Sequence, residues 1–194
     1  MFYLRWPDEE RVRAALRDVA AAPFTHSHEG ITRESLESAP PGFVLDRYGV
    51  ELGRGEAVLG AASEALRDFG NYPPSFTRVF RLEETFEVGT VFGTVASHFG
   101  FASMNPCRIA YVIDEPEVGR FGFGLGTVPG HAASGEERFL VSLDPNSGLV
   151  HYDVQAISRP AVWLARLGRP AMRWLQGRFR AESCETMQGL ARGG

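Results

Sequence analysis

The residues best suited to chemistry lie close together in the second half of the chain. His131 follows a Pro-Gly turn and is followed by two acids, Glu136 and Glu137, and by Arg138. A histidine in a loop titrates near neutral pH, so a carboxylate that orients its ring could make it a general acid or base. We take His131 and Glu137 as the candidate catalytic residues.

A purely structural role for these residues is the alternative that we favour. His131 would then bind the backbone of its own loop, and Glu137 would pair with Arg108 or Arg159. Buried ion pairs more often have a structural role than a catalytic one.

Other catalytic or cofactor-binding motifs are missing from the sequence. His26-Ser27-His28-Glu29 offers possible metal ligands, but no second cluster at zinc-like spacing supports it, so we expect a surface loop and no metal. The glycine-rich run Phe121–Gly126 lies within a predicted strand and is not followed by a helix, unlike a nucleotide fingerprint. No Gly-x-Ser-x-Gly motif or phosphate-binding loop is present, and no cofactor is expected.

The first part of the chain predicts two helices with a strand between them. Pro7 to about Ala22 and Glu56 to Phe69 carry apolar residues at helical spacing. Phe43–Leu52 can form a strand. The polar stretch His26–Gly42 is typical of an irregular surface connection.

The next part predicts five strands separated by turns. Strands this close in sequence pair as antiparallel neighbours, because parallel pairs need longer crossovers. The expected strands are roughly Thr85–His98, Pro106–Asp114, Arg120–Val128, Glu136–Leu143 and Leu149–Ser158.

A long helix from Pro160 to about Met187 completes the predicted elements, with a kink near Arg169. The order of elements favours an α+β helix-grip fold, in which a bent antiparallel sheet wraps the C-terminal helix. We expect one domain over residues 1–194, with an N-terminal helix and connection (1–42) and a helix-grip body (43–188).

Alternation along the strands predicts which residues face the helix. On one strand Phe121, Phe123 and Leu125 share a face, and three glycines share the other, which suggests sharp bending or close approach of another backbone. A bent sheet would leave a cavity under the helix. The residues expected to line it are Tyr111, Phe123, Tyr152 and Trp163, with Glu137 and Arg159 as polar ends. The alternative is a core filled by these aromatic residues.

Composition narrows the class of protein. Of 194 residues, 44% are hydrophobic and 23% are charged, as in ordinary globular proteins. The two cysteines read as free thiols, and neither a signal peptide nor a membrane-spanning run is evident, so we expect a cytoplasmic protein. The pI near 5.8 argues against nucleic acid as main partner.

The arginine-rich C-terminal helix could touch a membrane surface, although a solvated basic face is the simpler interpretation.

Several stretches together resemble the bacterial and plant "uncharacterised protein family 0548". This resemblance implies a START-like helix-grip fold and no established activity. The chain has Leu125 where the family pattern has tyrosine. The stretches are Phe121–His131, Gly135–Phe139, Leu52–Gly55, Arg108–Val112, and Ser158–Pro160 leading into Leu164–Gly168.

The function we expect is the binding of a small apolar or aromatic molecule between the sheet and the C-terminal helix. Two alternatives remain open. One is an enzyme of cyclase or hydrolase type that uses His131 and Glu137, and the other is association with a membrane or protein through the C-terminal helix. The sequence does not indicate the oligomeric state.

Overall fold

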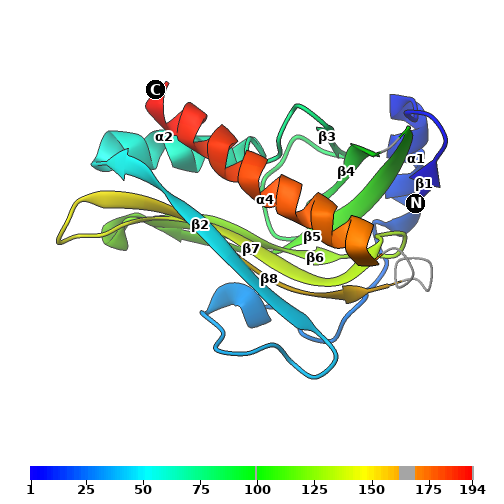
Figure 1. Ribbon diagram of the computed structural model, residues 1–194, viewed down its shortest axis with the longest axis horizontal. Helices are drawn as coiled ribbons and strands as arrows, with labels where there is room; N and C mark the ends of the chain where they lie inside the picture. Colours follow the sequence, from blue (N-terminus) through cyan, green and yellow to red (C-terminus); the bar gives the residue numbers. More distant parts are fainter. Residues whose placement is uncertain (99, 162–168, 194) are drawn as a thin grey trace.

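The protein, described here by a computed structural model, is built on one antiparallel sheet (Figure 1). The structure describes residues 1–98, 100–161 and 169–193. The sheet has eight strands in the order β2-β8-β7-β6-β5-β4-β3, and the short β1 pairs with β5. The strands are β1 (Phe2–Tyr3), β2 (Val44–Arg54), β3 (Thr77–Arg81), β4 (Val91–His98), β5 (Phe101–Glu115), β6 (Arg120–Thr127), β7 (Ala133–Leu143) and β8 (Leu149–Pro160).

Helices cover both faces of this sheet. The long α4 (Arg169–Arg192) crosses the concave face and meets α2 (Glu56–Arg67) at its C-terminal end (Figure 1). The outer face is covered by α1 (Glu9–Val19) and by a segment that contains the short helix η1 (Ile31–Arg33). A second short helix, η2 (Pro116–Val118), joins β5 to β6. The predicted arrangement, a bent antiparallel sheet around a C-terminal helix, is confirmed.

The sequence missed two strands and misplaced the starts of two others, β4 and β5. Strand β5 begins at Phe101, five residues before the predicted start at Pro106. The stretch predicted as one strand over Thr85–His98 forms β4 only from Val91, and Gly89 adopts a positive φ of 97° in the turn before it. The missed strand β1 has only two residues, too few to show alternation, and in β3 the apolar residues Val79 and Phe80 are adjacent and do not alternate with polar ones. The predicted kink near Arg169 depends on Gly168, which lies outside the described residues.

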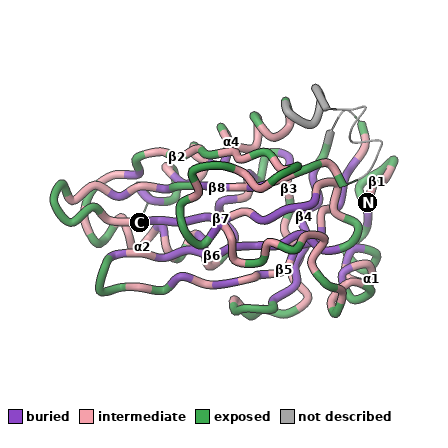
Figure 2. Tube along the Cα trace, turned by 90° about the horizontal axis from the view of Figure 1, so that it is seen from below, coloured by how far each residue is buried: buried purple, intermediate pink, exposed green. Residues whose placement is uncertain are grey.

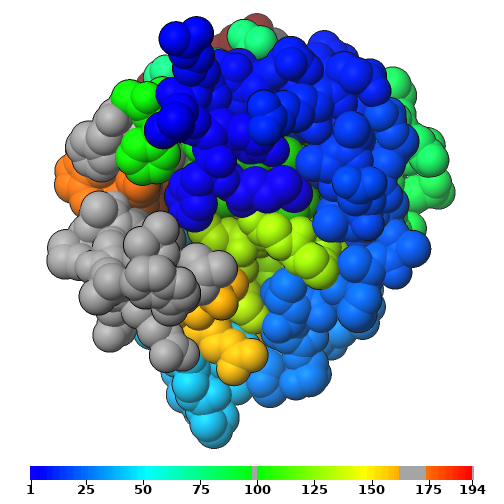
Figure 3. All heavy atoms as spheres, turned by 90° about the vertical axis from the view of Figure 1, so that its right-hand side faces the viewer, coloured from blue at the N-terminus to red at the C-terminus, as the bar shows by residue number. Residues whose placement is uncertain are grey.

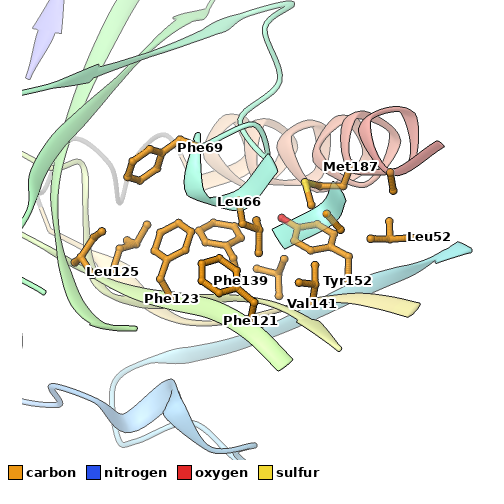
Figure 4. Packing of buried hydrophobic residues seen from close by; sticks show 14 of the residues in the cluster. Leu52, Leu66, Phe69, Phe121, Phe123, Leu125, Phe139, Val141, Tyr152 and Met187 are labelled. Carbon is orange, nitrogen blue, oxygen red and sulfur yellow. The ribbon is translucent and has the colours of Figure 1, made fainter. Parts of the chain in front are cut away.

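The largest hydrophobic cluster fills the closed end of the fold, between the sheet, α2 and the C-terminal half of α4 (Figure 4). Phe123, Phe139 and Tyr152 are fully buried in it, and Met187 of α4 packs against them. Figure 2 shows that buried residues follow the central strands, whereas the tips of the loops are exposed. Burial of a large aromatic side chain contributes about 2–3 kcal/mol, so this end of the molecule should be its most stable part.

The three alternating glycines of β6 face outward, away from α4. A Cβ atom on Gly124 would lie 2.2 Å from the ring of Tyr111, and one on Gly126 would lie 2.5 Å from the ring of Phe24. Gly124 and Gly126 therefore make room for aromatic rings on the outer face. At Gly122 the close group is backbone, since a Cβ atom there would lie 2.3 Å from the carbonyl oxygen of Phe139. The expected close approach of backbone is found at Gly122, and side chains take that place at the other two glycines.

A buried carboxylate ties the segment around η1 to the outer face of the sheet. Glu136 of β7 accepts hydrogen bonds from the backbone N–H of Gly30 (2.7 Å) and from the N–H and hydroxyl of Thr32 (2.8 and 2.7 Å). The hydroxyl of Tyr111 lies 2.8 Å from that of Thr32. Gln155 of β8 donates to the carbonyl of Glu34 at 2.8 Å. These contacts hold an irregular segment in place with polar groups that would otherwise be buried without partners.

Gly124→Ala should destabilise the fold by about 1–3 kcal/mol, because the added methyl group collides with the packed Tyr111 ring. Urea denaturation measures the change. The matched control is Gly60→Ala within α2, where a Cβ atom meets nothing within 4 Å. That control should gain about 0.5–1 kcal/mol from helix propensity. Equal effects at the two positions would contradict the steric role of Gly124.

Candidate functional site

A pocket of about 620 Å³ lies between the sheet and the N-terminal half of α4, at the opposite end from the filled cluster. Its apolar wall is made of Tyr72, Phe76, Cys107, Leu125, Leu175 and Phe179. Phe2, Tyr3 and Leu4 also line it, and Phe2 and Leu4 are exposed, so this end of the pocket faces solvent. Figure 3 looks at this end of the molecule, where the dark-blue N-terminal residues lie beside yellow-green atoms of the sheet.

The pocket exists because the inward side chains become smaller along each strand. At the filled end they are mostly large and apolar, and toward the pocket they are small or polar. Small side chains cannot reach α4, so the space between the layers stays open. The inward series are Phe121, Phe123, Leu125 and Thr127 along β6, Val141, Phe139, Glu137 and Gly135 along β7, and Tyr152, Val154, Ala156 and Ser158 along β8.

Polar groups from three elements meet on one wall of the pocket. Asp46 and Tyr48 come from β2, Glu137 from β7 and Arg180 from α4. The guanidinium of Arg180 forms an ion pair with Asp46 at 3.0 Å, and both side chains are largely buried. The hydroxyl of Tyr48 is buried, and apart from its contact with the Glu137 carboxyl it has no hydrogen-bond partner within the described residues.

The carboxyl group of Glu137 is the most perturbed acid of this wall. Burial raises its pKa from 4.5 to about 7, and the charge of Asp46 adds to this shift. The Arg180 guanidinium and the Tyr48 hydroxyl oppose it. Near neutral pH this carboxyl can therefore be protonated or ionised, depending on what lies beside it.

His131 also lines the pocket, but its ring is not oriented by Glu137. Its Nδ1 accepts a hydrogen bond from the backbone N–H of Ala133 at 2.9 Å. Burial lowers its pKa to about 4, so the ring is neutral at neutral pH. Of the two interpretations, this geometry matches the loop-fixing one for His131. The partners expected for Glu137, Arg108 and Arg159, lie elsewhere.

Tyr111 does not line the pocket, and its predicted orientation is wrong. A β-bulge at Ala110 shifts the pairing, so that Ile109 pairs with Leu125 but Tyr111 pairs with Gly124. The extra residue reverses the alternation and turns Tyr111 onto the outer face, where it packs with Ile113 and Leu140.

The other predicted lining residues divide among three places. Phe123 and Tyr152 do face α4, but they lie in the filled cluster, where the Tyr152 hydroxyl is 3.0 Å from that of Ser183. Arg159 lies outside the pocket, with its guanidinium 4.6 Å from the ring centre of Phe43. Trp163 lies outside the described residues. Among the predicted ligand-binding residues that the structure describes, Glu137 is the one that lines the pocket.

The basic face expected on the C-terminal helix is partly neutralised. Arg178 pairs with Glu182 at 2.6 Å, and Arg180 turns inward to Asp46. Trp174 is exposed. Arg166 lies outside the described residues, and nothing is described of the Arg169 and Arg173 side chains. Within the described residues, no helix is long and apolar enough to cross a membrane.

Metal coordination finds no support in the part of the chain that is described. No group of three or more His, Cys, Asp or Glu side chains there could hold an ion. His26 binds the backbone N–H of His28 through Nδ1 at 3.2 Å, and its ring stacks on Phe24. The His26–Glu29 stretch is thus part of the outer covering segment.

The sequence analysis missed Asp46, Tyr48 and Arg180. They lie far apart in the chain, and only the pairing of β2 with β8 and the crossing of α4 bring them to Glu137. One signal was available. Ala156, Ser158 and Gly135 continue the inward series of β7 and β8 with small residues, which marks the end of the sheet that is not filled.

Glu137→Gln should remove a pH dependence of stability. The folded state holds the Glu137 proton to about pH 7 and the unfolded chain only to about 4.5, so this group makes the parent less stable as pH rises between these values. The free energy of unfolding of the variant relative to the parent should therefore increase across this window, by up to about 3 kcal/mol before solvent screening. Denaturation from pH 4 to pH 8 measures it.

The titration of His131 is common to both proteins and cancels in this difference. Glu51→Gln, at an exposed position on β2, is the control and should show no such trend. Parallel curves for the parent and Glu137→Gln would mean that Glu137 titrates normally in the folded protein.

Comparison with known sequences gives a family match over most of the chain. The sequence model of a family described as a domain of unknown function (DUF1990) matches residues 25–186. A UPF0548 protein of Deinococcus radiodurans is 33% identical over 181 residues, which cover 88% of this chain and 88% of that protein. A UPF0548 protein of Dictyostelium discoideum is 28% identical over 203 residues, which cover 96% of this chain and 94% of that protein.

Comparison with solved structures supports the same fold. The Zhui aromatase/cyclase from Streptomyces sp. R1128 aligns with a TM-score of 0.52 at 13% identity, over 77% of this chain and 94% of that one. A point mutant of Thalictrum flavum norcoclaurine synthase, in complex with a transition-state analogue, aligns with a TM-score of 0.53 at 9% identity, over 78% and 95%. Likeness at this level of identity concerns the helix-grip architecture only.

Proposed function

The chain belongs to the family of the domain of unknown function DUF1990, and from this premise we propose that it binds a small apolar or aromatic molecule between the sheet and α4. The observation that carries the proposal is the pocket of about 620 Å³, which is within the usual range of about 300–1,000 Å³ for small-molecule sites. Aromatic side chains such as Tyr72, Phe76 and Phe179 dominate its wall, and a few polar groups converge at one side.

The fold adds weight to this proposal. One structure of the same architecture is named as an aromatase/cyclase, and another holds a transition-state analogue. Leu125 adds an apolar side chain to the wall of this pocket.

The catalytic alternative has less support. His131 would have to exchange a proton near neutral pH, yet its Nδ1 is held by the backbone of Ala133 and its pKa lies near 4. Glu137 has a pKa near 7, but its hydrogen-bonding group among the described residues is Tyr48, whose raised pKa makes it a poor proton relay. Binding is therefore the function that these residues favour.

The Ala156→Phe variant tests the proposal by filling the pocket. Ala156 lines it from β8, and a phenyl ring at this position would project between the sheet and α4. The probe is the apolar fluorophore N-phenyl-1-naphthylamine, whose emission rises in an apolar environment. We expect saturable binding to the parent protein near one probe per chain, and a Kd at least tenfold higher for Ala156→Phe.

The control carries the same substitution at an exposed position, Ala57→Phe on α2, and should bind the probe like the parent. Thermal unfolding of all three proteins checks that they fold. Absence of saturable binding to the parent would contradict the proposal, and so would equal binding by Ala156→Phe and the parent.

A further inference from the structure

Glu137 and Tyr48 are polar groups that lie beside each other on the pocket wall. Arg180, the cation with the largest effect on the pKa of Glu137, is held by Asp46 at 3.0 Å, and no ion pair within the described residues occupies the Glu137 carboxyl. Within the same residues the buried Tyr48 hydroxyl has no hydrogen-bonding partner other than this carboxyl. An ionised carboxylate in such a place is destabilised unless a proton or a cation lies beside it.

The other groups that face Glu137 do not supply a cation. Tyr72, Cys107 from β5 and Tyr152 from β8 all have raised pKa values because they are buried, and each of these shifts includes the charge of Glu137. Tyr48 from β2 behaves in the same way. All four are therefore uncharged near neutral pH, which leaves Asp46 and Arg180 as the charged groups with an effect on Glu137.

The charge pattern selects among ligands. An anionic ligand would meet Glu137 and Asp46, while Arg180 is already engaged. A neutral ligand would leave the proton on Glu137. A protonated amine can replace that proton, donate to the carboxylate and to the Tyr48 oxygen, and lie near the rings of Tyr72 and Phe179.

Resting on the proposed function, we propose that the ligand is a protonated amine on an apolar or aromatic body, with its ammonium group seated between Glu137 and Tyr48. The apolar body occupies the space lined by Leu125, Leu175 and Phe179. The Glu137 carboxylate then pairs with the charge of the ligand, and the aromatic side chains of the wall pack against its apolar body.

Three naphthalene compounds of similar size test this inference. They are 1-naphthylmethylamine, which is cationic, 1-naphthylmethanol, which is neutral, and 1-naphthoic acid, which is anionic. Calorimetric titration at pH 8 should give an amine affinity at least tenfold above that of the alcohol, and the acid should bind most weakly. The amine affinity should fall about tenfold from pH 8 to pH 6, because Glu137 becomes protonated over this range, whereas the alcohol affinity should stay constant.

Glu137→Gln should abolish both the preference for the amine and its pH dependence, while the alcohol still binds. Glu51→Gln, an exposed acid on the same sheet, should behave like the parent. Alcohol binding reports that the Glu137→Gln pocket is intact. If Glu137→Gln does not fold, the affinities of the parent protein for the three naphthalene compounds are sufficient to test the preference for an amine.

The outcomes separate this inference from the proposed function. If the alcohol binds as tightly as the amine at pH 8, or N-phenyl-1-naphthylamine binds and the amine does not, the amine inference is wrong and the apolar-ligand proposal stands. If neither N-phenyl-1-naphthylamine nor any of the three compounds binds, both proposals fail.

Discussion

The constraint on which the rest of the structure depends is the change of side-chain size along the concave face of the sheet. Phe123, Phe139 and Tyr152 reach α2 and the C-terminal half of α4 and fill one end. Beyond them, residues such as Ala156 and Gly135 are too small to reach the helix. The same helix therefore packs on the filled core through residues such as Met187 and lines the open pocket with Leu175 and Arg180. The filled end can supply the stability that an unfilled pocket does not.

The outer face is held by a different kind of interaction. Buried polar groups, above all Glu136 with Gly30 and Thr32, fix an irregular segment that has little apolar surface of its own. The adjacent acids of β7 thus have opposite roles, because neighbouring residues on a strand point to opposite faces. Glu136 accepts three hydrogen bonds from Gly30 and Thr32, whereas Glu137 faces the pocket, where burial raises its pKa.

Much of the architecture could be predicted from the sequence, since alternation, turns and helical spacing are local signals. The five-strand meander and the C-terminal helix followed from them. The site was harder to predict, because its geometry depends on a β-bulge and on the pairing of distant strands, and the alternation of residues within a strand indicates neither. The bulge at Ala110 turned Tyr111 outward, and the pairing of β2 with β8 brought Asp46 and Tyr48 to Glu137. Glu137 itself was found because a carboxyl in an apolar alternating series is conspicuous.

The central claim is that open space lies between the sheet and the N-terminal half of α4. The most direct measurement is a crystal structure of the protein grown with N-phenyl-1-naphthylamine. The account predicts density for the probe between Ala156 of β8 and Phe179 of α4, beside Leu125. An interior in which Leu175 and Phe179 pack directly on Ala156, with no space and no probe between them, would contradict it.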